Sequence, residues 1–327
     1  MKKIISVLLS TLLSLLISAC ILSGCGAQSD DGEKKLSVVT TIFPEYDWVM
    51  HIVGDEAENV EVSALSGSGV DMHSYQPTAD DIIKISACDL FIYVGGESDS
   101  WTEDALREAV NKDMKVINLL EALGDEVKEE EIIEGMESEE EDGHGHDEAE
   151  YDEHVWLSLR NAATLSEKIR DAIVELDPEN KELYEKNTAD YVEKLNALDN
   201  EYSTAVRAAK TKTILFGDRF PFRYLADDYG LEYFAAFAGC SAESEASFET
   251  VAFLANKVDE LGLTAVLTIE GSDCKIADTV VATTEKKSAR ILTMDSMQSV
   301  SREEMDAGVT YLSVMEKNLS VLKDALN

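Results

Sequence analysis

Short β-branched runs alternate with helical stretches along most of this 327-residue chain. In its first half, four runs predict strands, at residues 36–40, 60–65, 90–94 and 115–118. Helices are expected between them, at about residues 45–53, 79–87 and 104–111. Strands that alternate with helices are typical of parallel sheets. The pattern therefore predicts an α/β fold for this half of the chain.

A second series of the same kind follows two long helical stretches. The first stretch covers residues 158–176, where apolar residues approximate a 3.6-residue period, and the second covers 181–210. Further strands are expected at residues 213–216, 231–236, 265–269 and 291–293. A closing helix is expected at 305–326. The chain is thus predicted to form two Rossmann-like lobes with mostly parallel sheets, at 36–157 and 177–327. The helix at 158–176 is expected to be a long rigid connector between them.

The N-terminus has the features of an export signal. Two lysines precede an apolar run over residues 4–22, as in a positive n-region followed by an apolar core. The run ends in Leu22-Ser23-Gly24-Cys25, which resembles the lipobox of bacterial lipoproteins. We therefore expect a signal peptide at 1–24, a lipid anchor on Cys25 and a flexible tether over 25–35. Cys20 fits the pattern loosely, and an uncleaved membrane helix is the alternative; in either case the remainder lies outside the cytoplasm.

The net charge and the cysteine content argue against two classes of protein. The formal net charge of -38 argues against nucleic acid, because phosphates would repel such a chain. Cys88, Cys240 and Cys274 are too few and too irregularly spaced for a disulfide framework or a Cys-x-x-Cys metal knuckle. Cys88 is expected in the core, whereas Cys240 and Cys274 could pair in an oxidising compartment. No function is assigned to these cysteines.

An acidic segment separates the first sheet from the long helices. Residues 125–153 contain sixteen acidic side chains, one lysine and no arginine, with Gly143-His144-Gly145-His146 near the middle. Such a segment has too little apolar surface to fold and is predicted to be a mobile loop. It is interpreted either as a solvated linker or as a loop that collects metal ions, since histidines and carboxylates both supply ligands.

Four potential metal ligands are expected after strands or in the loops nearby. They are His73, His154, Asp218 and Asp295. In open α/β sheets, ligands bind beyond the carboxyl ends of the strands. Two imidazoles and two carboxylates form a donor set suited to Zn²⁺ or Mn²⁺. Taken singly, each histidine has the alternative of a surface residue and each aspartate that of a turn or cap residue.

The chain resembles the metal-specific substrate-binding lipoproteins of ABC importers for zinc and manganese over nearly its whole mature length. The resemblance is carried by Thr41-Ile42-Phe43-Pro44, Gly69-Val70-Asp71-Met72-His73-Ser74-Tyr75-Gln76-Pro77-Thr78, Asp152-Glu153-His154-Val155-Trp156-Leu157, Tyr229-Gly230-Leu231 and Met294-Asp295-Ser296. It implies two pseudo-symmetric lobes joined by one rigid helix. It also implies a metal ion held between the lobes by His73, His154 and Asp295, and delivery of that ion to an ABC permease by a monomer.

The chain departs from this family at the third ligand. A histidine or glutamate is expected after the first strand of the C-terminal lobe, where this chain reads Phe216-Gly217-Asp218-Arg219-Phe220-Pro221-Phe222-Arg223-Tyr224. Asp218 aligns if one residue is inserted before Tyr224. Without the insertion Arg219 takes the place, and a cation cannot ligate a metal. Three glutamates remain as alternatives: Glu243, Glu245 and Glu270.

Zinc is the favoured metal, with manganese as the alternative, because zinc binds more tightly to almost any such donor set. Imidazoles must be neutral to ligate, so the affinity is expected to fall as the pH drops through the imidazole range near ~6.5. The sequence contains no His-Glu-x-x-His and no Gly-x-Ser-x-Gly motif, which argues against an enzyme. A metal-dependent surface adhesin is the other alternative, and the lack of repeats or an added adhesive domain favours transport.

Overall fold

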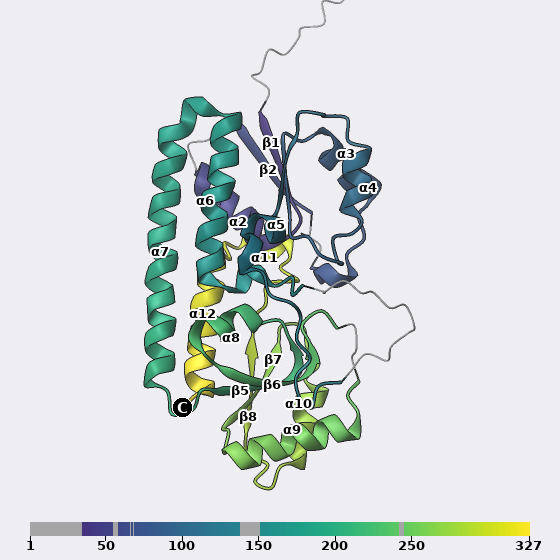
Figure 1. The fold of residues 1–327 in the computed structure, drawn as a ribbon, viewed down its shortest axis with the longest axis vertical. Helices are drawn as coiled ribbons and strands as arrows, with labels where there is room; N and C mark the ends of the chain where they lie inside the picture. Colours follow the sequence, from purple (N-terminus) through teal and green to yellow (C-terminus); the bar gives the residue numbers. More distant parts are fainter. Residues whose placement is uncertain (1–34, 55–57, 66, 68, 138–150, 242–244) are drawn as a thin grey trace, which may run out of the picture. The chain divides into compact units, whose positions relative to one another are not determined.

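Two parallel β-sheets of four strands each organise the chain (Figure 1). The computed structural model describes residues 35–54, 58–65, 67, 69–137, 151–241 and 245–327. Residues 36–327 form one unit. The predicted signal peptide, Cys25 and tether lie outside the described residues, apart from Lys35. Among the helices that the structure describes, none is long and apolar enough to cross a membrane.

The N-terminal sheet has the strand order β2-β1-β3-β4. Its strands are β1 (Leu36–Thr40), β2 (Val60–Ala64), β3 (Leu90–Tyr93) and β4 (Lys115–Asn118). Its helices are α2 (Phe43–Val53), α3 (Ala79–Ala87), α4 (Thr102–Arg107) and α5 (Leu119–Leu123). The side chain of Thr78 accepts a hydrogen bond from the backbone of Asp81 and so caps α3. All four predicted strands are present, with ends that differ by at most one residue.

The C-terminal sheet repeats this order as β6-β5-β7-β8. Its strands are β5 (Thr213–Phe220), β6 (Glu232–Ala238), β7 (Ala265–Ile269) and β8 (Arg290–Met294). Its helices are α8 (Arg223–Tyr229), α9 (Phe248–Leu261), α10 (Lys275–Thr283), α11 (Arg302–Asp306) and α12 (Tyr311–Ala325). Strand β5 is longer than predicted because a register shift between Phe216 and Arg219 accommodates Gly217 and Asp218, both weak strand formers.

Two long helices join the sheets, and the second of them contacts both lobes. Helix α6 (Leu159–Leu176) begins at Ser158, and α7 (Lys181–Ala208) follows the turn η4 (Pro178–Asn180). Helix α7 packs against α2 of the first lobe and against α8 and α12 of the second (Figure 1). Its 28 residues give it a length of about 42 Å. The long connector of the fold is therefore α7 rather than the helix predicted at 158–176.

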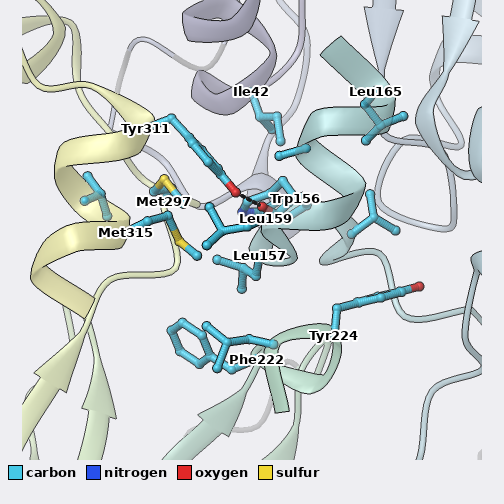
Figure 2. Packing of buried hydrophobic residues seen from close by; sticks show 14 of the residues in the cluster. Ile42, Trp156, Leu157, Leu159, Leu165, Phe222, Tyr224, Met297, Tyr311 and Met315 are labelled. Atoms are coloured by element: carbon cyan, nitrogen blue, oxygen red, sulfur yellow. Dashed lines mark hydrogen bonds between the residues drawn. The ribbon is translucent and has the colours of Figure 1, made fainter. Parts of the chain in front are cut away.

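A hydrophobic core continues from one lobe into the other, with Trp156 and Tyr311 in its middle (Figure 2). The Tyr311 hydroxyl donates to the carbonyl of Trp156 at 2.6 Å. The Trp156 indole donates to the carbonyl of Ser296 at 2.8 Å. The backbone N–H of Tyr311 donates to Asp47 on α2 at 3.1 Å. These contacts fix the segment that carries His154 between the two lobes.

The described part of the acidic segment is anchored, contrary to the prediction of a mobile loop over 125–153. The backbone N–H of Glu137 donates to the carbonyl of Ala236 on β6, an edge strand. The backbone N–H of Lys128 donates to the Tyr224 hydroxyl at 3.0 Å, and Met136 is buried. The segment has no core of its own and uses the second lobe instead. Residues 138–150, with His144 and His146, lie outside the described residues.

Candidate metal centre

His73 lies on the short turn η1 (Met72–Ser74), after β2 of the first lobe. The Asp71 carboxylate accepts hydrogen bonds from the His73 backbone at 3.0 Å and from its Nδ1 at 2.8 Å. Because a carboxylate can only accept, Nδ1 carries the hydrogen and Nε2 has its lone pair available. Burial raises the pKa of Asp71, but the hydrogen bond from His73 and the charge of Arg219 outweigh it, so this pKa lies well below its usual range.

His154 repeats this arrangement at the junction of the lobes, directly before η3 (Val155–Leu157). The Asp152 carboxylate accepts from the His154 backbone at 2.9 Å and from its Nδ1 at 3.0 Å. The side chain of His154 is 0% exposed. Both histidines therefore end an Asp-x-His triplet in which the aspartate fixes the ring. This shared spacing is visible in the sequence, although the sequence analysis assigned no role to Asp71 or Asp152.

The two imidazoles lie side by side, with ring centroids 5.2 Å apart. Within the described parts of the chain, Nε2 of each ring is buried and has no hydrogen-bond partner. A histidine that donates through one ring nitrogen to a carboxylate and keeps the other for a cation is the usual arrangement of a metal ligand. The structure thus brings together two of the four predicted ligands, His73 and His154.

Cys240, which follows β6 in the second lobe, lies close to both histidines. Ligand atoms of Cys240, His73 and His154 all lie within 4.8 Å of one another. The backbone N–H of Cys240 donates to Glu130 at 3.0 Å. Burial, followed by the nearby charges of Glu130 and Glu153, raises the pKa of the Cys240 thiol. The only signal in the sequence was a cysteine placed just after a strand, a position that the sequence analysis gave no function.

Glu153 is a further buried group beside His73. Its Oε1 accepts from the backbone of Ser98 at 2.9 Å, and its Oε2 lies 3.9 Å from Nε2 of His73. The described residues provide no hydrogen-bond partner for that second oxygen. Gly96 makes room for the side chain, since a Cβ at this position would lie 2.3 Å from Oε1 of Glu153. Glu153 stands beside His154 in the Asp152-Glu153-His154 motif, but nothing in the sequence marks it as a metal donor.

Asp218 and Asp295, the other two predicted ligands, are not among the three residues of this cluster, and their assignment as ligands stays a prediction. Asp218 lines a cavity of about 610 Å³ that both lobes share, and its Oδ1 accepts from the backbone of Arg219. Asp295 instead accepts from the backbone of Met297 at 2.9 Å, so its carboxylate closes its own loop. Burial raises the pKa of Asp295.

Of the alternative glutamates, Glu245 and Glu270 are also outside the cluster. Glu270 accepts from the backbone and hydroxyl of Ser296 at 2.7 and 2.6 Å. Burial, with the charge of Asp295, raises its pKa to about 7. Glu245 is exposed, and Glu243 lies outside the described residues. None of these observations places a glutamate of the second lobe beside the two histidines.

Arg219 stands in the first strand of the second lobe and reaches the first lobe. Its guanidinium donates to Oδ2 of Asp71 at 2.6 Å, while the other oxygen of Asp71 holds His73. One carboxylate therefore joins a ligand of the first lobe to a cation of the second. The arginine does not ligate a metal, but it contacts the residue that orients one ligand.

Fold and site together define a two-lobed α/β binding protein with metal donors where the lobes meet. The profile of the ZnuA family, described as zinc-uptake complex component A, periplasmic, matches residues 38–325. The chain belongs to this family.

Similar proteins are found in two bacteria. The high-affinity zinc uptake system protein ZnuA of Bacillus subtilis is 32% identical over 320 residues, which cover 95% of this chain and 94% of that protein. The zinc-binding lipoprotein AdcA of Streptococcus pneumoniae is 36% identical over 331 residues, or 99% of this chain. The chain spans only 61% of the length of that AdcA.

The fold also matches solved structures. The Zn(II)-bound ZnuA-like domain of Streptococcus pneumoniae AdcA superposes with a TM-score of 0.68 and 32% sequence identity. The match covers 89% of this chain and 99% of that domain. The predicted family and fold class, with two parallel-sheet lobes and a long helix, are thereby confirmed.

Proposed function

We propose that this protein binds a zinc ion between its lobes outside the cytoplasm and delivers it to an ABC importer. The observation that carries the proposal is the pair of neighbouring imidazoles, each held by an aspartate through Nδ1 and each with a buried Nε2 for which the described residues provide no hydrogen-bond partner. The names of the relatives in Bacillus subtilis and Streptococcus pneumoniae support zinc as the ion.

The remaining parts of the proposal concern placement and partners. Residues 1–24 would direct export, Cys25 would carry the lipid and residues 25–35 would separate the anchor from the lobes. The lipoprotein relative in Streptococcus pneumoniae supports this arrangement. The partner would be the membrane permease of the importer. The protein acts as a carrier and catalyses no reaction.

The first test is elemental analysis of the purified mature protein after exchange against equimolar Zn²⁺ and Mn²⁺. We expect one zinc per chain and little manganese. The variants Asp218→Ala and Asp295→Ala, measured in parallel, test the ligands predicted from the sequence. A wild-type protein that retains neither metal would refute the proposal, and preferential retention of manganese would support the alternative metal.

Removing the carboxylate that orients His154 should weaken zinc binding without removing a ligand. In Asp152→Ala the ring loses the acceptor of its Nδ1 hydrogen, and we expect the zinc affinity to fall about 10–100-fold. Competition against a chromophoric chelator measures this change. Asp190→Ala, on the exposed face of α7, is the matched control and should leave the affinity unaltered. Equal affinities in the two variants would contradict the assigned role of Asp152.

Residues 138–150 should be dispensable for equilibrium binding. Replacing them with a Gly/Ser linker of equal length leaves every proposed ligand and its hydrogen-bond partners in place, including Glu130 and Asp152. We expect the same zinc affinity in the chelator competition, with slower capture when zinc is scarce. A linker variant that fails to bind zinc would place a ligand in this segment. A replacement that began at residue 130 would also remove Glu130 and would not be an equivalent test.

A further inference from the structure

We propose that the thiolate of Cys240 is the third protein ligand of this site and takes the place of the imidazole that the chain lacks. The inference rests on the proposed zinc-binding function and specifies its donor set. It begins from the cluster of Cys240, His73 and His154, whose ligand atoms lie within 4.8 Å of one another. A zinc ion with Zn–N distances of about 2.0–2.1 Å and a Zn–S distance of about 2.3 Å requires donors at such separations.

The histidines supply independent support, because they are arranged for a cation whatever Cys240 does. The His154 side chain is fully buried, and its Nε2 finds no hydrogen-bond partner in the part of the chain that is described. A buried polar atom without a partner carries a free-energy cost that a bound ion would remove. Among the described residues of the second lobe, Cys240 is the group that comes close enough to both histidines to share that ion.

The surroundings of Cys240 hold its backbone against His154. Gly239 precedes it, and a Cβ on Gly239 would lie 3.0 Å from Cε1 and 3.1 Å from Nδ1 of the His154 ring. The absence of a side chain there lets the end of β6 approach the imidazole. Glu130 accepts from the Cys240 N–H and fixes the turn from the opposite side. Gly239 and Glu130 thus position Cys240 as a donor of the second lobe.

Arg219 stands in the stretch where a histidine or glutamate ligand is expected, so the second lobe needs a donor from another position. Its guanidinium is paired with Asp71 and cannot bind a cation. The first strand of this lobe therefore contributes an ion pair to the first lobe, and the neighbouring strand β6 contributes the donor. Oε2 of Glu153, 3.9 Å from Nε2 of His73, is a further oxygen available for a fourth position.

A thiolate changes the chemistry expected of the site. Coordination replaces the S–H bond of Cys240 with a sulfur–zinc bond, and the proton passes to the solvent. Thiolates are soft ligands that favour zinc over manganese, whereas carboxylates and water suit manganese. The donor set of two imidazoles and one thiolate therefore predicts stronger discrimination against Mn²⁺ than the four-donor set expected from the sequence.

Cobalt substitution of the mature protein tests the proposal directly. We expect wild-type protein with one Co²⁺ per chain to show thiolate-to-cobalt charge-transfer absorption in the near ultraviolet. The band should disappear in Cys240→Ser and persist in Cys274→Ser, the matched control at another partly buried free thiol. Zinc affinity should fall in Cys240→Ser by more than the ~100-fold upper range for residues that only orient a ligand.

The outcomes separate this inference from the proposed function. Wild-type protein that binds cobalt and zinc without the charge-transfer band would overturn the role of Cys240 and leave zinc binding intact. This result does not depend on whether the serine variant folds. A band that remains in Cys240→Ser would also overturn it. Wild-type protein that binds neither metal would refute the proposed function itself.

Discussion

Replacing His154 with alanine is expected to abolish zinc binding under competition with a chelator. The substitution removes one of the two imidazole donors, the fully buried one, and the remaining groups cannot surround the ion. Since residues that only orient a ligand contribute about 10–100-fold, loss of the ligand itself should exceed that range. His73→Ala should have a similar effect. Zinc content and affinity, measured on the purified mature variants, check both expectations.

Folding effects must be separated from loss of the ligand, because His154→Ala also removes the Nδ1–H hydrogen bond to the buried Asp152 carboxylate and leaves only the backbone one. His154→Gln addresses this point, since the amide N–H can still donate to Asp152. His51→Ala is the control, because His51 stacks on Tyr191 on the α2–α7 side with ring centroids 4.3 Å apart. The control should bind zinc normally. Normal zinc binding by His154→Ala would exclude this histidine as a ligand.

Replacing Trp156 with alanine should produce the largest loss of stability. Its side chain is 0% exposed within the core that the lobes share, and its indole N–H is bonded to Ser296. Truncation of a buried tryptophan typically lowers the free energy of unfolding by roughly 3–5 kcal/mol, through lost burial and the cavity that remains. Urea denaturation in the presence of a chelator measures the change without a contribution from bound metal.

Trp101→Ala provides the comparison for this prediction. Trp101 is only partly buried and packs at the margin of a small cluster in the first lobe. Its truncation should therefore cost clearly less. If the two variants lost equal stability, the shared core around Trp156 would not be the main support between the lobes. A single unfolding transition in the wild type would agree with a core that both lobes use.

The sequence predicted the sheets better than the helix that joins them. Strands of three to eight residues with turn signals at each end are defined locally, so their positions could be read directly. The connector helix could not be identified in this way, because both long helical stretches, 158–176 and 181–210, are amphipathic. Which of them joins the lobes depends on contacts with distant parts of the chain. Helix α7 contacts α2, α8 and α12, which are far from it in sequence. The extension of β5 past Gly217 was missed for the same reason, since its partner β6 compensates for weak local propensity.

At the site, motifs located the histidines but not the donor from the second lobe. His73 and His154 stand in recognisable sequence contexts, and their aspartates are two residues away. Cys240 meets them only because β6 ends at the junction of the lobes, a fact that no local pattern contains. Asp295 follows β8 and Asp218 lies within β5, yet neither is among the three clustered residues; Asp218 accepts from the backbone of Arg219 and Asp295 from that of Met297. A position near the end of a strand therefore identifies candidate metal ligands but does not show which of them meet at the site.

Helix α12, near the C-terminus, packs against α2 of the first lobe. Packing of the first lobe is therefore complete only when α12 is present. Tyr311 near the C-terminus donates to Asp47 and packs edge-on against Trp48 at 5.5 Å. A chain made from its N-terminus presents α2 long before its partner α12 exists. The apolar surface of α2 then stays uncovered until almost the last residue has been added. A protein truncated by a few tens of residues should thus be left with incomplete packing in its first lobe.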